Sequence, residues 1–168
     1  PEALELLLLS VLNQTHLPNE VIIADDGSKE ETKQLIEKFQ KVFPIPLIHI
    51  WHPDNGNQKP KIMNMAIAKA QYDYIVEIDG DIIMNRHFVQ DHLENAEKGV
   101  YLFGSRVNIQ HSILESIFKN KTIHFGLFAS GIKKRGRTIR LPFLMKWAKL
   151  HDKRSGKLRG CNMSFWRE

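Results

Sequence analysis

Short apolar runs alternate with helical patterns over the first hundred residues, and this alternation limits the fold more than any other feature. Four runs have the length and apolar character of strands that are covered on both faces, namely residues 21–24, 47–51, 74–78 and 100–103. Helical patterns accompany them, at residues 2–12, 28–39, 60–70 and 88–98. This order is typical of an α/β fold, in which a mostly parallel sheet carries helices on both faces.

Local signals add detail to this outline. The first helix is apolar nearly all round, which indicates burial on more than one side. Ser28 and Glu31 have the spacing of a capping box at the start of the second helix. After residue 107 the regularity fails: residues 112–118 and 142–150 are helix candidates, and residues 131–140 are predicted to be a basic loop.

The composition is that of a single globular domain. Of the 168 residues, 42% are hydrophobic and 26% charged, which excludes a disordered chain. No apolar run has the length of a membrane-spanning helix. A lone cysteine, Cys161, excludes an internal disulfide and a multi-cysteine zinc site. It fits the reducing conditions of the cytoplasm, where we expect the protein to reside.

The charge is divided unevenly along the chain. The net charge of +5 combines −7 over residues 1–100 with +12 over residues 101–168. Basic residues cluster from 133 to 140 and precede an apolar and aromatic stretch, a pattern that suits the surface of an anionic membrane. The alternative is a solvated basic face beside core side chains. The cluster comprises Lys133, Lys134, Arg135, Arg137 and Arg140, and the stretch comprises Leu141, Phe143, Leu144 and Trp147.

Acidic residues end two of the predicted strands. Asp25 and Asp26 follow the first strand, and Asp79-Gly80-Asp81 follows the third. Open parallel sheets bind ligands at this edge, and residues two apart in an extended chain point to the same side. Because no histidine or cysteine accompanies Asp79 and Asp81, the pair favours a hard cation shared with phosphate oxygens. Taken singly, either acidic group also fits an ordinary turn.

Two further residue types lie near these strand ends. Lys59 and Lys61 flank Pro60 at a predicted helix start, where a phosphate or a solvated first turn would be equally in place. His49 and His52 are interpreted as one packed and one exposed histidine. The sequence contains no P-loop, no Gly-x-Ser-x-Gly elbow and no His-Glu-x-x-His motif.

Several segments together resemble glycosyltransferase family 2, whose members have the Rossmann-like GT-A fold. The matching segments follow the order of that family over most of the chain. They are Ser10–Thr15, Glu20–Ser28, Lys61–Ile67, Tyr74–Asp81 and Gly160–Glu168. The branch most resembled acts on bacterial surface polysaccharide or lipopolysaccharide.

The resemblance implies a role for each matching residue. Asp26, with Asp25 beside it, corresponds to the acid that contacts the nucleoside, and Lys61 to a basic position near the base or diphosphate. Asp79, Gly80 and Asp81 correspond to the Asp-x-Asp motif, with Asp81 the more direct ligand of Mn²⁺ or Mg²⁺. Gly160, Cys161 and Asn162 fall in the pocket for the donor sugar and the acceptor.

The resemblance also implies the reaction and the partners. The donor is a nucleotide-diphosphate sugar, with uridine diphosphate the expected carrier, and the acceptor is a hydroxyl of a glycan or a lipid-linked glycan. Transfer inverts the anomeric centre, and a carboxylate takes the acceptor proton. The expected location is the cytoplasm, with peripheral contact at the inner face of the membrane, and no nucleic acid is expected as a partner.

Two departures from the family pattern stand out. The family's first strand, which lies in the middle of the sheet, has no counterpart before residue 1, and the usual catalytic base is expected downstream of Glu168. Glu168 is the one candidate base within the chain. We therefore expect one domain, incomplete at both ends, in which residues 1–107 bind the nucleotide sugar and residues 108–168 form a basic acceptor side.

Two other function classes remain open on the residues alone. A phosphatase of the haloacid-dehalogenase type also has Asp-x-Asp after an apolar strand, although normally on its first strand and with Thr or Val where this chain has Ile83. A non-catalytic module that binds a nucleotide sugar or a membrane surface would fit the basic second half and the missing base.

Overall fold

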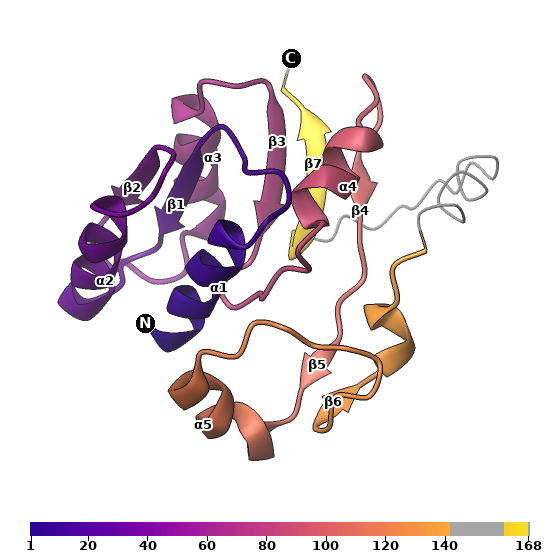
Figure 1. The fold of residues 1–168 in the computed structure, drawn as a ribbon. Helices are drawn as coiled ribbons and strands as arrows, with labels where there is room; N and C mark the ends of the chain where they lie inside the picture. The colour runs from indigo at the N-terminus through magenta and orange to yellow at the C-terminus, as the bar shows by residue number, and fades with distance from the viewer. Residues whose placement is uncertain (142–159, 168) are drawn as a thin grey trace.

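The computed structural model describes residues 1–141 and 160–167, and the α/β class is confirmed in this part of the chain (Figure 1). The helices are α1 (Glu2–Leu12), α2 (Glu30–Gln40), α3 (Lys59–Lys69), α4 (Phe88–Glu94), α5 (His111–Asn120) and the 3₁₀ helix η1 (Arg135–Thr138). The strands are β1 (Val21–Asp25), β2 (Leu47–Trp51), β3 (Tyr74–Ile78), β4 (Leu102–Phe103), β5 (Asn108–Ile109), β6 (Ile132–Lys133) and β7 (Asn162–Trp166).

The strands form three groups. β1 and β2 pair in parallel, from Val21 opposite Leu47 to Asp25 opposite Trp51. β3, β7 and β4 form a second sheet in that order, and β5 pairs with β6. Figure 1 shows β1 and β3 running in the same direction, so Asp25 and Asp79 lie at the same edge. Within the described residues, no strand joins β1 to β3.

The central position of β7 was not predicted from the sequence. β7 lies between β3 and β4 and is antiparallel to both, with Ile78 opposite Asn162 and Leu102 opposite Ser164. Asn162 and Ser164 are polar residues that alternate along the strand, so β7 lacks the continuous apolar run by which the other strands were found. The expected strand at 100–103 shortens to Leu102–Phe103 and does not adjoin β3.

The core lies between the helices and the β1–β2 pair. Leu8 of α1 and Ile36 of α2 are fully buried, and they pack with Leu47 of β2 in one cluster. The burial of Leu6, Leu7 and Leu8 confirms that α1 is covered on more than one side. Figure 1 shows α1 in front of the strands and α3 behind them, so helices cover both faces as predicted.

Local details differ from the sequence expectation at two places. No capping box forms, because the backbone N–H of Ser28 donates to Asp25 Oδ1 and α2 begins only at Glu30. The basic segment at 131–140 contains β6 and η1 and is not a plain loop. The helix predicted at 112–118 is present as α5, and the candidate at 142–150 lies outside the described residues.

Polar contacts from α1 fix the chain that follows the Asp79–Asp81 turn. The backbone N–H of Met84 donates to Ser10 Oγ, at 3.1 Å. Gln14 donates through Nε2 to the carbonyl of Asn85 and accepts through Oε1 from the N–H of Val89. The later part of the segment between β3 and α4, and the first turn of α4, are therefore held against α1 and the residues that follow it. None of the helices in the described part of the chain is long and apolar enough to span a bilayer.

Candidate functional site

Asp25, at the end of β1, is a structural residue. It is 5% exposed; its Oδ1 accepts from the Ser28 N–H, and its Oδ2 lies 2.8 Å from His49 Nε2. Burial alone would raise the pKa of Asp25, but hydrogen bonds from Ser28 and His49 outweigh burial and lower it. The carboxylate thus stays charged and shapes the turn after β1.

Asp26 connects that turn to the start of α3. Its Oδ2 accepts from the backbone N–H of Gln58 at 3.0 Å. Its Oδ1 is buried and lies 3.1 Å from His52 Nε2, but the two atoms are not aligned for a hydrogen bond. Asp26 therefore has one oxygen without a hydrogen-bonding partner among the described residues, at the edge where the family resemblance leads us to expect a nucleoside.

The two histidines were misjudged from the sequence. His49 is the middle residue of β2, and His52 directly follows that strand. His49 faces Asp25, the last residue of β1, and His52 faces Asp26, the residue after it. The His52 side chain is 11% exposed, so its interpretation as an exposed residue was wrong. The parallel pairing of β1 with β2 brings these residues together, and the signal that could have found them is their common position at neighbouring strand ends.

Asp79 and Asp81 lie on a tight turn after β3. The N–H of Ile82 donates to the carbonyl of Asp79 at 3.2 Å, which closes the turn around Gly80 and Asp81. Both Gly80 and Asp81 are exposed, and a Cβ at Gly80 would meet no atom within 4 Å. Among the described residues, no three His, Cys, Asp or Glu side chains form a metal-binding group, so the turn offers a pair of carboxylates without a third ligand of these types.

Lys59, and not Lys61, contacts the Asp-x-Asp turn. Lys59 Nζ lies 2.6 Å from Asp79 Oδ1, and this bond is the main reason that the pKa of Lys59 is raised. Arg106 NH1 lies 4.0 Å from Asp79 Oδ2. Lys61 instead donates to the side chain of Gln58, at 3.3 Å. Both lysines flank Pro60 in the first turn of α3, so spacing alone could not separate them.

β7 brings the segment from Gly160 to Asn162 to the same edge. Asn162 lies opposite Ile78, the residue before Asp79, and its carbonyl accepts from the N–H of Gly104. A Cβ at Gly160 would lie 2.8 Å from Glu77 Oε1, so the two residues are in close contact. The edge thus combines Asp26, Asp79, Asp81 and Lys59 with Asn162, although they come from distant parts of the sequence.

Comparison with protein-family models identifies the family of the chain. The model for glycosyl transferase family 2 matches residues 1–155, which is most of the chain. The chain belongs to this family. The resemblance drawn from the sequence is confirmed.

Relatives of this family 2 chain are polysaccharide synthases. The chain is 31% identical over 137 residues to a hyaluronan synthase of Pasteurella multocida, and the match covers 73% of the chain and 14% of that protein. It is 28% identical over 174 residues to a chondroitin synthase of Escherichia coli, covering 96% of the chain and 24% of the relative. A poly-beta-1,6-N-acetyl-D-glucosamine synthase of Staphylococcus epidermidis is 26% identical over 137 residues, with 79% and 32% covered. The chain therefore spans a third or less of the length of these relatives.

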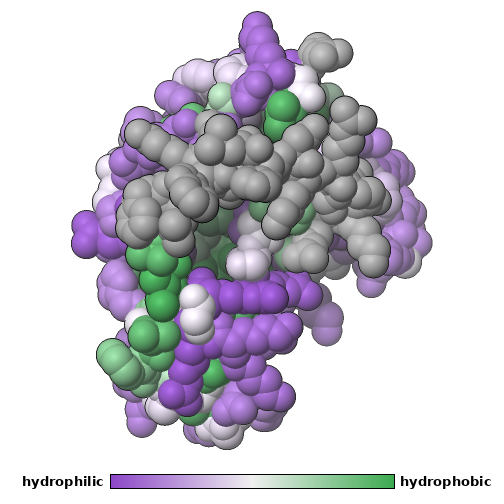
Figure 2. Space-filling view, turned by 90° about the vertical axis from the view of Figure 1, so that its right-hand side faces the viewer, coloured by the Kyte–Doolittle hydropathy of each residue, from purple (hydrophilic) through white to green (hydrophobic). Residues whose placement is uncertain are grey.

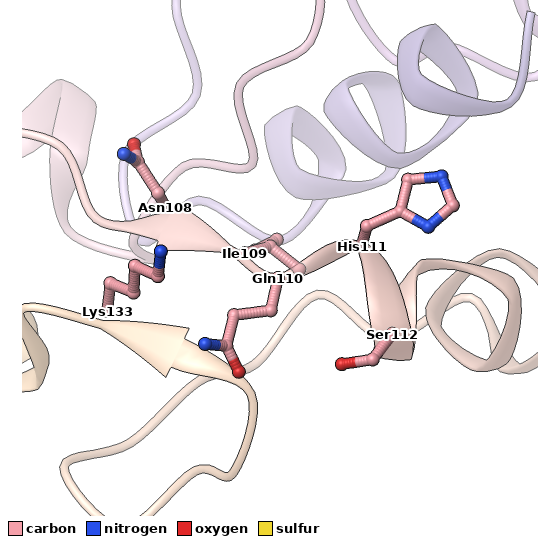
Figure 3. Close-up of a pocket in the computed structure, with 6 residues that line it drawn as sticks. All are labelled: Asn108, Ile109, Gln110, His111, Ser112 and Lys133. Carbon is pink, nitrogen blue, oxygen red and sulfur yellow. The ribbon is translucent and has the colours of Figure 1, made fainter.

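One pocket among the described residues of this family 2 chain lies away from the predicted residues. It has a volume of about 420 Å³ and is lined by β5, the first turn of α5 and Lys133 of β6 (Figure 3). None of the aspartates at the ends of β1 and β3 lines it. The charged groups converge instead at the strand ends, on an open edge of the kind at which α/β sheets bind ligands without an enclosed cavity.

Proposed function

We propose that this chain carries the nucleotide-sugar site of a glycosyltransferase that moves a sugar from a uridine diphosphate donor to an acceptor hydroxyl in bacterial polysaccharide synthesis. The observation that carries the proposal is the convergence of Asp26, Asp79, Asp81 and Lys59 at one edge of the sheet. The names of the relatives, all synthases of sugar polymers, support the reaction class.

Asp79 and Asp81 are the residues that would hold Mn²⁺ or Mg²⁺. The turn presents two carboxylates without sulfur or imidazole ligands, which suits a hard cation that is shared with diphosphate oxygens. A bound dication would offset the negative charge that develops on the leaving diphosphate. Gly80 has open space around it, so a bulky ligand can approach the backbone there.

Lys59 would bind the diphosphate from the other side. Its amine stands at the N-terminus of α3, where the helix dipole already favours an anion. In the structure it neutralises Asp79. If Asp79 held a cation, the Lys59 amine would be free to donate to a phosphate oxygen.

The acceptor proton would go to a carboxylate, and the displacement would invert the anomeric centre in one step. Glu168, the candidate base within the chain, lies outside the described residues. The expected division at residue 107 remains a proposal, to which the structure adds that β7 of the second part pairs with β3 of the first.

Isothermal calorimetry with uridine, guanosine and adenosine diphosphates in the presence of Mn²⁺ tests the nucleoside role of Asp26. We expect uridine diphosphate to bind most tightly, because Asp26 would accept from the base, the part in which the three nucleotides differ. Asp26→Asn should weaken it about 10-fold, since it replaces a charged acceptor while its amide oxygen can still accept from Gln58. Glu97→Gln, at an exposed acid after α4, is the control. Equal affinity for the three nucleotides, or no loss in Asp26→Asn, would contradict the role.

We also propose that the basic face contacts an anionic membrane that carries the acceptor. Lys133, Lys134, Arg135 and Arg137 are exposed. Arg140, which the sequence grouped with them, instead forms a bidentate pair with Asp91, with Nε and NH2 at 2.6–2.9 Å from the carboxylate. Figure 2 shows hydrophilic and hydrophobic side chains next to one another on this side of the molecule. Leu141 is 42% exposed, whereas Phe143, Leu144 and Trp147 lie outside the described residues.

Co-sedimentation with vesicles tests the membrane contact. Binding should require anionic lipid and weaken with salt, because it rests on exposed charges. Lys133→Gln/Arg137→Gln should reduce it about 30-fold, from ~1 kcal/mol for each charge. Lys33→Gln/Lys38→Gln in α2 removes the same charge from another surface and should have little effect. Binding that is equal on neutral and anionic vesicles would reject the electrostatic contact.

A further inference from the structure

Four side chains form a polar chain between β3, α4 and β7. Tyr74 Oη lies 2.8 Å from Ser164 Oγ, which lies 2.7 Å from His92 Nδ1. His92 Nε2 in turn lies 3.0 Å from Asn162 Oδ1. Ser164 is 0% exposed and His92 is 8% exposed, so both residues depend on one another for hydrogen bonds.

The direction of these bonds follows from the atoms involved. Asn162 Oδ1 can only accept, so His92 Nε2 carries the proton and donates to it. His92 Nδ1 is then the acceptor of a neutral ring, and Ser164 Oγ donates to it. Burial is the main cause that lowers the pKa of His92, against the bond to Asn162 and the charge of Asp91, which raise it. A neutral ring therefore fits the site. Asp91 is itself bound by Arg140.

This chain of bonds fixes the orientation of the Asn162 amide. With Oδ1 held by His92, Nδ2 points the other way, toward Gly104. A Cβ at Gly104 would lie 2.1 Å from Nδ2, so only glycine leaves room for the amide there. Gly104 follows β4, whose end lies at the same edge as Asp79, because β4 and β3 are both antiparallel to β7. The Nδ2 donor thus lies at the edge of the candidate site.

The order of groups along this edge indicates what the amide meets. Asp26 follows β1, Asp79 follows β3, and Asn162 begins β7, the strand beside β3. A nucleotide sugar with its nucleoside at Asp26 and its diphosphate at Asp79 would have its sugar beside Asn162. An N–H donor at that point suits a sugar oxygen.

We propose that His92 is a positioning residue, which holds the Asn162 amide so that Nδ2 donates to an oxygen of the donor sugar. This inference rests on the proposed function. It assigns to an α4 histidine, which no sequence motif singled out, a part in recognition of the sugar and not of the nucleotide.

Calorimetry with Mn²⁺ compares uridine diphosphate with its glucose and N-acetylglucosamine derivatives. His92→Phe removes the donor but fills the space, and should weaken binding of the sugar derivative that the native chain prefers by about 3- to 10-fold. Binding of uridine diphosphate itself should stay within about 2-fold. His92→Gln, whose amide nitrogen can replace Nε2, should restore most of the loss. His124→Phe, at an exposed histidine, is the control.

Two further measurements test the inference even if His92→Phe does not fold. Gly104→Ala displaces the amide without touching His92 and should reproduce the selective loss. Nitrogen NMR of the native chain should show His92 as the neutral ring protonated at Nε2. Equal loss of uridine diphosphate and its sugars in His92→Phe, unchanged sugar binding in Gly104→Ala, or a ring protonated at Nδ1 would each overturn the inference. Absence of Mn²⁺-dependent uridine diphosphate binding to the native chain would instead overturn the proposed function.

Discussion

Asp81→Ala is expected to abolish the effect of Mn²⁺ on uridine diphosphate binding. In the native chain Mn²⁺ should tighten that binding about 30-fold or more, ~2 kcal/mol, because the cation would join Asp79 and Asp81 to the diphosphate. Asp81 is exposed on the turn after β3, so its truncation leaves the core intact. Calorimetry of both proteins with and without Mn²⁺ gives the two ratios.

Substitution of Lys59 provides a second test of the Asp-x-Asp turn, because it should change Mn²⁺ affinity and nucleotide affinity in opposite directions. Lys59→Met should raise the affinity of Mn²⁺ in the absence of nucleotide, because the amine no longer competes for Asp79. The same variant should lower the affinity of uridine diphosphate, because a cation near the phosphates is lost. Nucleotide binding that is independent of metal in the native chain, and unchanged in Asp81→Ala, would remove the Asp-x-Asp turn from the site.

Gly27→Ala is expected to be the most destabilising single substitution in the turn after β1. Gly27 has a φ of +85°, and a Cβ there would lie 2.6 Å from Asp54 Cα and 2.7 Å from Asp54 N. The left-handed conformation costs a non-glycine residue about 1–2 kcal/mol, and displacement of the backbone at Asp54 raises the total to about 3 kcal/mol or more. The displaced loop also carries His52 and Gln58 away from Asp26, so nucleotide binding should fall as well.

Gly56→Ala separates the two causes. Gly56 has a φ of +81° but no atom within 4 Å of an added Cβ, so this variant has the strain without the collision. The free energy of unfolding of Gly56→Ala, measured with urea, should fall by only about 1–2 kcal/mol. If the free energy of unfolding falls equally in both variants, the close packing of Gly27 against Asp54 does not contribute to the cost of Gly27→Ala.

The elements that the sequence predicts well are those whose signal is local. β1, β2 and β3 are mostly apolar runs, α1 is apolar nearly all round, and α2 and α3 carry apolar residues at helical spacing. The ends of these elements were therefore located to within a few residues. The acidic residues that end β1 and β3 followed from the same pattern. β7 escaped prediction because Asn162 and Ser164 bind Tyr74 and His92, which are far away in the sequence.

The sequence predicted which acidic residues lie at the candidate site, but it did not predict which side chains they contact. The pairing of His49 with Asp25, of His52 with Asp26 and of Lys59 with Asp79 depends on how loops meet in space. A lysine two residues from another cannot be distinguished by spacing when both lie in one helical turn. Pair contacts of this kind are fixed by the tertiary fold, to which a single sequence gives no direct access.

The place of β7 has a consequence for how the chain folds. β1 and β2 are joined through α2 by a short crossover, so this unit closes a small loop and can form early. β3 can pair only after β7 is available, and β7 follows it by about 80 residues; among the described residues β4 also pairs with β7 alone. The Asp26 end of the edge can therefore form while the chain is still being synthesised. The Asn162 end forms only once residue 166 has left the ribosome, so the two ends of the proposed site form at different times.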